Sequence, residues 1–174
     1  MWTTTDSPIG ELRIVEQKGS VVALDFVGPM PAGGPQTSSM TAAATRADGR
    51  PLGERDDSLP VLREAITQLA AYFARDLKEF DLPLDPYGTD FQRRVWEQLR
   101  RIGYGDTASY GEIAGRLGMT GHAARAVGLA NGRNPIPVVI PCHRVVGADG
   151  SLTGYGGGIE RKQLLLDLET DALF

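Results

Sequence analysis

The chain has 174 residues, which is enough for one ordinary domain or two small ones. Hydrophobic residues make up 41% and charged residues 23% of the chain, a balance typical of a folded protein that excludes disorder throughout. No stretch has the apolar length of a membrane span, and the first ten residues lack the basic start and apolar core of a signal peptide. We therefore expect a cytoplasmic protein with no membrane partner.

The net charge of −4 is unevenly distributed along the chain. Residues 1–85 carry 8 Lys+Arg against 13 Asp+Glu, whereas residues 86–174 carry 10 against 9. From Arg93 to Arg144 there are 8 arginines and only 3 acids. This concentration of positive charge favours contact with a phosphate backbone, but arginines on solvated helix faces explain it equally well.

The first half of the chain predicts a small antiparallel sheet. Residues 2–7, 11–17 and 20–27 have the composition and alternation of strands, and turn signals at Pro8-Ile9-Gly10 and Lys18-Gly19 separate them. Residues 28–60 are rich in Gly, Pro, Ser, Thr and Ala without apolar periodicity, which predicts a long mobile loop that buries little surface.

A helix is predicted after this loop, because apolar residues recur at helical spacing between Val61 and Leu77. Ser58 is its expected cap, and the helix is expected to cover the sheet. Residues 79–84 are expected to return as a short strand, followed by a linker at 83–88. Residues 1–85 would then form an N-terminal α+β domain and residues 86–174 a second domain.

The second half is predicted to be mostly helical. Thr89 to Gln92 has the pattern of a capping box and opens a helix that Gly103 stops, and Ser109 to Glu112 opens a shorter helix that ends at Gly118. A further helix is expected over about residues 121–130. Two short helices around a glycine turn indicate a helix-turn-helix, so the fold class is α+β with a winged helix-turn-helix-like unit.

The predicted second helix of this unit, GHAARAVGLA, presents alanine and glycine where sequence-reading proteins place amides or several arginines. Small side chains would let the backbone approach DNA closely, with Arg125 inserted where a base has been removed. Packing of the same face into a core is an equally good explanation.

Cys142 is the only cysteine and lies in the run PVVIPCHRVVG, residues 137–147. A single thiol excludes an internal disulfide, and with two histidines in the chain it offers no thiolate-rich zinc set, so no metal is expected. On composition alone a lone cysteine here is more often a small buried hydrophobe than a nucleophile. Three prolines around it predict a shaped loop, and the adjacent His143 can take the thiol proton. Downstream, LTGYGGG surrounds Tyr155 with glycines, which suits close approach of backbone to a flat ligand.

The motifs NPIPVVIPCHRVVG, SYGEIA, ARAVG, TGYGGG and LLDLE, in this order, resemble the O6-alkylguanine-DNA alkyltransferase family over about residues 86–170. The resemblance implies a direct-reversal DNA repair protein, a methylated-DNA–protein-cysteine S-methyltransferase that moves the alkyl group to its own cysteine and is spent after one turnover. No cofactor is implied. The implied partner is double-stranded DNA containing O6-alkylguanine, with O4-alkylthymine as a second candidate, bound by a monomer with or without cooperativity.

The resemblance also assigns roles to individual residues. Cys142 is similar to the alkyl acceptor, His143 to the residue that takes its proton, and Glu169 to the acid that orients the histidine. Asn134 matches a hinge asparagine, and Tyr110 a proton donor to the departing base. The implied DNA surface comprises Arg125, Tyr110, Ala123, Ala124 and Gly128. The implied base pocket comprises Tyr110, Val145, Ala148, Gly154, Tyr155 and Gly156, with Gly156 where the family often has serine.

Three other classes are consistent with parts of the sequence. A cysteine hydrolase would use the same thiol and histidine but would turn over and need an oxyanion hole. A lesion-binding relative without transfer activity normally has tryptophan in place of the cysteine, so Cys142 argues against it. A winged-helix regulator would prefer one DNA sequence and would not depend on Cys142.

Overall fold

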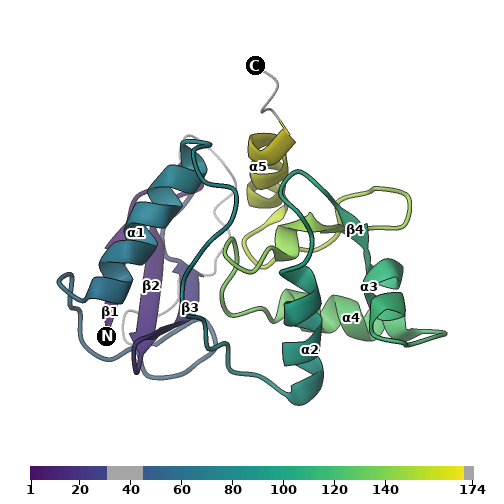
Figure 1. Cartoon of the computed structure of the whole chain (residues 1–174), viewed down its shortest axis with the longest axis horizontal. Coiled ribbons are helices and arrows are strands. Elements are labelled where there is room, and N and C mark those ends of the chain that lie inside the picture. The colour runs from purple at the N-terminus through teal and green to yellow at the C-terminus, as the bar shows by residue number, and fades with distance from the viewer. Residues whose placement is uncertain (31–44, 171–174) are drawn as a thin grey trace. The chain divides into compact units, whose positions relative to one another are not determined.

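The computed structural model describes residues 1–30 and 45–170, which divide into two compact units, Met1–Pro86 and Tyr87–Phe174 (Figure 1). The first unit contains a small antiparallel sheet with a helix, and the second is mostly helical. The predicted α+β class is therefore confirmed.

The sheet of the first unit consists of β1 (Trp2–Thr5), β2 (Leu12–Gln17) and β3 (Ser20–Phe26), paired antiparallel in the order β1-β2-β3. Lys18 and Gly19 both have positive φ, as a tight turn between β2 and β3 requires. The core residues of the two longer strands are buried, among them Leu12, Ile14 and Leu24. The predicted antiparallel sheet is present.

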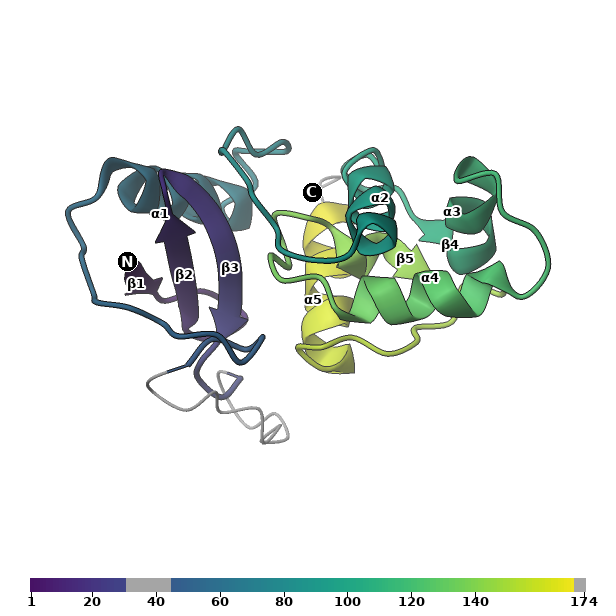
Figure 2. The ribbon, with the colours of Figure 1, turned by 90° about the horizontal axis from the view of Figure 1, so that it is seen from below.

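Helix α1 (Pro60–Phe73) lies across one face of this sheet and buries Leu62, Leu69 and Tyr72 (Figure 2). Its start differs from the prediction: the N-cap is Leu59, without a side-chain hydrogen bond, while the Ser58 hydroxyl donates to Asp56 at 2.6 Å. Leu59 has no side-chain acceptor to offer, while Pro60 suits the first helical position because its fixed φ is helical and it has no amide hydrogen of its own to satisfy. The helix ends before Leu77 because Arg75 adopts a left-handed conformation with φ 65°.

Residues 79–84 do not form the expected strand; among the described residues this segment pairs only through a parallel bridge between Val21 and Leu84. The Val21 amide donates to the Pro83 carbonyl, and the Asp85 amide donates to the Val21 carbonyl. Pro83 has no amide hydrogen for a ladder, so the contact stays local.

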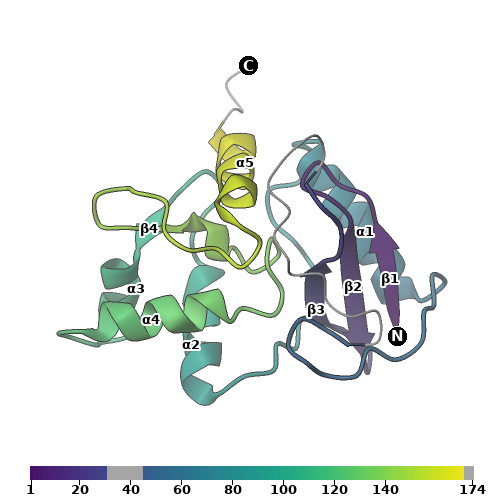
Figure 3. The same cartoon turned by 180° about the vertical axis from the view of Figure 1, so that it is seen from behind.

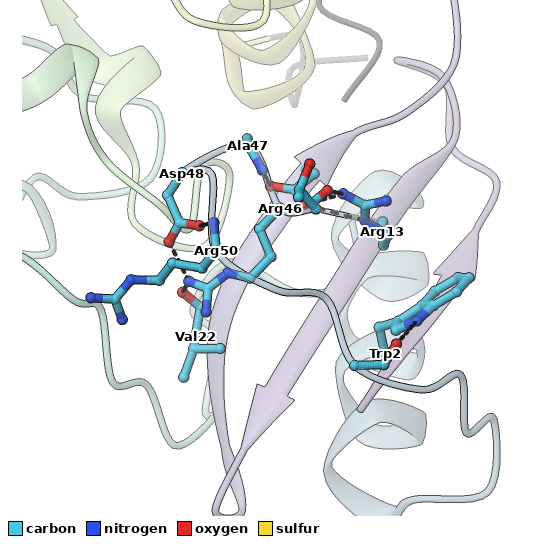
Figure 4. A network of polar contacts seen from close by, with 10 residues as sticks. Trp2, Arg13, Val22, Arg46, Ala47, Asp48 and Arg50 are labelled. Atoms are coloured by element: carbon cyan, nitrogen blue, oxygen red, sulfur yellow. Dashed lines mark hydrogen bonds and ion pairs between the residues drawn. The ribbon is translucent and has the colours of Figure 1, made fainter. Parts of the chain in front are cut away.

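Part of the predicted 28–60 loop, residues 31–44, lies outside the described residues. Residues 45–59 contradict the expectation of little burial, because Arg46 and Leu52 are each only 4% exposed. Arg13, paired with Asp25 across β2 and β3, donates to the Thr45 carbonyl at 2.7 Å, and Arg46 donates to Asp48 and to the Val22 carbonyl (Figure 4). Hydrogen bonds from charged side chains hold residues 45–59 against the sheet, so the pattern of hydrophobic residues in the sequence did not predict that this segment is buried.

The second unit begins with α2 (Asp90–Leu99), followed by β4 (Ala108–Ser109), α3 (Tyr110–Arg116) and α4 (Ala123–Gly132) (Figure 3). Both predicted capping boxes are present: the Thr89 and Ser109 hydroxyls accept from the amides of Gln92 and Glu112. Gly118 and Gly121 have positive φ in the turn between α3 and α4, as expected for a helix-turn-helix.

The rest of the second unit builds the cysteine loop. A 3-10 turn, η1 (Cys142–Arg144), leads into β5 (Val145–Val146), which pairs in parallel with β4, and α5 (Ile159–Thr170) follows. The Trp96 indole donates to the Ala130 carbonyl at 2.8 Å, which ties α2 to α4. The buried residues Val95, Ile113, Val127, Ile140 and Leu165 form part of the core beneath these elements.

The caps give a direct test of this local structure. Replacing Thr89 or Ser109 with alanine is expected to lower the free energy of unfolding by about 1 kcal/mol, because each substitution leaves a helix amide without its acceptor. Ser58→Ala is the matched control and should change it by much less, since Ser58 caps no helix. Urea denaturation of the whole chain, monitored by circular dichroism, measures the free energy of unfolding of all three variants. An equal decrease in all three would contradict the assignment of Thr89 and Ser109 as helix caps.

Candidate active site

Cys142 opens the 3-10 turn directly after Pro141 and is only 4% exposed. Its amide donates to the Ile140 carbonyl at 2.8 Å, and the Arg144 amide donates to the Pro141 carbonyl at 3.0 Å. Val138, a β-branched residue, adopts φ 72° just upstream, a conformation that such residues rarely take. The loop is thus held in a specific, strained shape that presents the thiol.

Asn134 braces the turn before the cysteine. Its amide nitrogen donates to the Ile140 carbonyl at 2.8 Å, and its carbonyl oxygen accepts from the Ile136 amide at 3.0 Å. A hydrogen bond from the Asn134 side chain also favours the ionised form of the Cys142 thiol. Asn131 of α4 adds a longer contact of 3.4 Å to the Cys142 carbonyl. The cysteine loop is therefore joined to the end of the helix-turn-helix.

His143 lies beside Glu169 of α5, with both side chains completely buried. The distance from His143 Nε2 to Glu169 Oε1 is 2.7 Å. An ionised carboxylate accepts hydrogen bonds only, so Nε2 carries the proton of a neutral imidazole. His143 Nδ1 is buried and has no hydrogen-bond partner among the described residues. The pair therefore leaves Nδ1 as a buried proton acceptor in the turn that contains the thiol.

Arg144 shares the same carboxylate. Its Nε and Nη2 donate to the two oxygens of Glu169, both at 2.9 Å, and its Nη1 donates to the Ile102 carbonyl at 2.6 Å. The guanidinium also lies over the Tyr104 ring, 5.9 Å from its centroid. Glu169 is thus held by a bidentate arginine as well as by the histidine.

The charges of this group are set by competition between burial and ion pairing. Burial alone would raise the pKa of Glu169, but the hydrogen bonds from His143 and Arg144, together with the charge of Arg144, outweigh it and hold the pKa at about 2. Burial lowers the pKa of His143, against the opposing effect of Glu169. At neutral pH the group is therefore a neutral imidazole next to a carboxylate that Arg144 keeps ionised.

Burial raises the pKa of Cys142 to about 11. Asn134 and the charge of Lys162 act in the opposite direction but do not overcome burial. Lys162 of α5 is itself completely buried, and its ammonium group donates to the Val145 carbonyl at 2.6 Å and to the Thr153 carbonyl at 3.0 Å. The resting cysteine is a thiol, so any reaction with an electrophile requires a base.

Tyr110, the first residue of α3, directs its hydroxyl to residues 152–158, the glycine-rich segment. The Tyr110 and Thr153 hydroxyl oxygens are 2.6 Å apart. Gly128 of α4 lies against the Tyr110 ring: a Cβ at this glycine would be 3.6 Å from the ring. Tyr110 therefore connects the start of α3, the face of α4 and residues 152–158.

The predicted DNA surface is present only in part. Arg125 of α4 is exposed, and Ala124 and Gly128 are half-buried. Ala123 is only 8% exposed and packs inward, because it lies one helical turn before the buried Val127. We therefore correct its assignment to the surface. Leu129 is 64% exposed one turn after Arg125, so the face is not composed of small residues alone.

The predicted pocket residues differ in their exposure. Val145 of β5 is completely buried, so its side chain is not on an open pocket wall. Ala148 is exposed in the turn closed by the Gly147 amide and the Ser151 carbonyl. Tyr155 is half-buried between the exposed Gly154 and Gly156.

Sequence reasoning missed Arg144, Lys162 and Thr153. Arg144 follows Cys142 and His143 directly, and a buried arginine beside a predicted acid could have been inferred from that motif. Lys162 gave no signal, because a lysine in a helix is normally solvated. Among residues 1–30 and 45–170, no group of three potential ligands is arranged to hold a metal ion. In the same residues, no helix is both long and apolar enough to span a membrane.

The fold and site define a class: a helix-turn-helix unit joined to a turn that holds a buried cysteine and a buried His-Glu pair. Models of known protein families match both units of the chain. Residues 90–171 match the DNA binding domain of 6-O-methylguanine DNA methyltransferase, and residues 1–86 match the ribonuclease-like domain of the same family. The chain belongs to the 6-O-methylguanine DNA methyltransferase family.

Individual relatives are similar at high identity. A methylated-DNA–protein-cysteine methyltransferase of Mycolicibacterium paratuberculosis is 66% identical over 105 residues, 60% of this chain and 63% of that protein. One from Methanosarcina acetivorans is 58% identical over 107 residues, 62% of this chain and 68% of its own length. The structure of Mycobacterium tuberculosis OGT in complex with DNA has a TM-score of 0.79 at 49% identity and covers 98% of this chain and 92% of that one.

The pKa of the thiol predicts how it reacts with a small reagent. With a pKa of about 11, the rate of Cys142 alkylation by iodoacetamide should rise about tenfold per pH unit between pH 7 and 10, because only the thiolate reacts. The urea-unfolded chain is the control and should level off near the ordinary cysteine pKa of about 8.5. A plateau below pH 8 in the folded protein would contradict the assignment.

The ion pairs of Glu169 predict the acid stability of the fold. The folded pKa of about 2 lies below the ordinary value of 4.5, so ionised Glu169 stabilises the fold above pH 4.5 and this stabilisation is lost as the pH falls towards 2. Glu169→Gln should be less stable than the original chain at pH 7 and should lose less between pH 4.5 and 2.5. Urea unfolding midpoints of both proteins, measured from pH 7 to 2.5, show how stability changes with pH. The same pH dependence in both would disprove that Glu169 is responsible for the loss.

Proposed function

We propose that this chain repairs O6-alkylguanine in double-stranded DNA by transferring the alkyl group to Cys142. The observation that carries the proposal is the buried Cys142-His143-Glu169 group, with a proton-accepting Nδ1 in the same turn as the thiol. Similarity to methylated-DNA–protein-cysteine methyltransferases and to a structure with DNA supports it. Residues 87–174 would bind DNA and perform the transfer.

The reaction follows from the chemistry of the group. His143 Nδ1 takes the thiol proton, directly or through a water molecule, and the charge of Lys162 favours the resulting thiolate. The sulfur attacks the alkyl carbon, the bond from that carbon to O6 breaks, and its electron pair stays on guanine. Tyr110 then donates a proton to the departing base. Asn134 keeps the turn in place during these steps.

The lesion must leave the base stack before a buried thiol can reach it, which requires a few kcal/mol. Arg125 is exposed on α4 and would fill the gap in the stack. The exposed Gly154 and Gly156 would offer backbone donors to the flipped base around Tyr155, as would the turn at Ala148. Because lesions occur in any sequence, binding would depend on phosphates and shape.

The product explains why the protein would act once. A thioether has no carbonyl for water to attack, and the chain has no second cysteine to displace it. This distinguishes the proposal from a cysteine hydrolase, which would regenerate its thiol. We further propose that the protein works in the cytoplasm as a monomer and accepts O4-alkylthymine as a second substrate, with cooperativity on DNA to be measured.

Transfer is tested by mixing the protein with a duplex that contains O6-methylguanine and measuring intact and peptide masses under denaturing conditions. The expected result is one methyl group on Cys142 for each guanine restored. Cys142→Ala is the control and should leave the lesion intact while still binding DNA. An unmodified thiol with a persisting lesion would refute the proposal, and product in excess of protein would favour a catalytic thiol enzyme instead.

The role of Arg125 is separable from the chemistry. Arg125→Ala should slow repair of a duplex by about 10- to 100-fold, because the extruded base is no longer replaced in the stack. On single-stranded DNA with the same lesion the rate should change little. Arg116→Ala, which removes another exposed arginine from α3, is the matched control for loss of positive charge. Equal effects of both variants on duplex repair would contradict an insertion role.

A further inference from the structure

Thr153 is a polar residue outside the proposed catalytic group whose side chain contacts that group. Its hydroxyl oxygen is 2.6 Å from the Tyr110 hydroxyl oxygen, although the two residues are 43 positions apart in the chain. Either hydroxyl can be the donor. At this distance, the contact is a strong O–H···O hydrogen bond between the glycine-rich segment and the start of α3.

Thr153 is itself fixed in place through its backbone. Its carbonyl accepts from Lys162 Nζ at 3.0 Å, and the same ammonium group donates to the Val145 carbonyl at 2.6 Å. One buried lysine therefore ties the glycine-rich segment to the end of the cysteine loop. Because this tie uses the backbone carbonyl of Thr153, it does not depend on the threonine side chain.

The ring and the hydroxyl of Tyr110 are held by different groups. Gly128 of α4 lies against the ring, where an added Cβ would be in van der Waals contact at 3.6 Å. This packing restricts the plane of the ring but leaves the hydroxyl hydrogen free to rotate. The Thr153 hydroxyl, 2.6 Å away, is the hydrogen-bond partner that orients it.

We propose that Thr153 is a positioning residue for alkyl transfer, which orients the Tyr110 hydroxyl and donates a hydrogen bond to its oxygen as the proton leaves. The inference rests on the proposed function, since it needs Tyr110 as the proton donor. In the transfer step the bond from Cys142 sulfur to the alkyl carbon forms while the bond to O6 breaks. The proton moves from Tyr110 to the guanine, and Thr153 keeps its own proton and stabilises the phenolate left behind.

The experiment compares single-turnover transfer rates of Thr153→Val and Thr153→Ser on a duplex containing O6-methylguanine. Valine has nearly the shape of threonine without the hydroxyl, so its rate constant at saturating DNA should fall about tenfold while DNA affinity stays unchanged. Serine restores the hydroxyl and should restore most of the rate. A rate constant equal to that of the original chain in Thr153→Val would overturn the proposal. If the valine variant does not fold, Thr153→Ala takes its place.

A double-mutant cycle separates positioning of Tyr110 from a general structural role. In a Tyr110→Phe background the phenolic oxygen is missing, so Thr153→Val should cause no further loss of rate. The same tenfold loss in both backgrounds would show that Thr153 acts elsewhere and would overturn the inference. Failure of the proposed function gives a different result, because the original chain itself would then acquire no methyl group on Cys142.

Discussion

The structure around Cys142 depends on one buried carboxylate. Glu169 accepts from His143 at 2.7 Å and from two nitrogens of Arg144 at 2.9 Å, and Arg144 continues to the Ile102 carbonyl. Helix α5, the cysteine turn and the segment after α2 therefore meet at a single group. Because Arg144 is permanently charged, it keeps Glu169 ionised whether or not His143 holds an additional proton. The same bonds that stabilise the fold thus fix the tautomer that leaves Nδ1 available.

The sequence predicted those parts of the fold that local chemistry determines. The capping boxes at Thr89 and Ser109 and the turn at Lys18-Gly19 are local signals, and each is present in the structure. The helical spacing from Val61 located α1 correctly, but the Ser58 cap was wrong, because the N-cap is Leu59 and the Ser58 hydroxyl is bonded to Asp56. The burial of Arg46 was missed because its hydrogen bond to the Val22 carbonyl, 24 positions away, leaves no periodicity in the sequence.

The same distinction applies to the site. Motifs assigned Cys142, His143 and Glu169, and the structure brings the last two into contact across 26 positions. Periodicity could have removed Ala123 from the surface, since it precedes the buried Val127 by four residues. Nothing in the sequence indicated that Lys162 is buried, because its partners are backbone carbonyls that every residue possesses. Contacts of this kind become visible only in three dimensions.

A thiol with a pKa of about 11 is an unusual choice for a nucleophile, and the single use proposed for Cys142 would explain the choice. At neutral pH only about one molecule in ten thousand holds a thiolate, so stray electrophiles react slowly with the buried sulfur. For an enzyme that turns over, such protection would mainly reduce the rate. For a chain with one cysteine and no means to regenerate it, each stray reaction would remove a whole protein molecule. Under the proposed function, burial would therefore reserve the thiol for a substrate that enters the site, where His143, Lys162 and Asn134 would favour the thiolate.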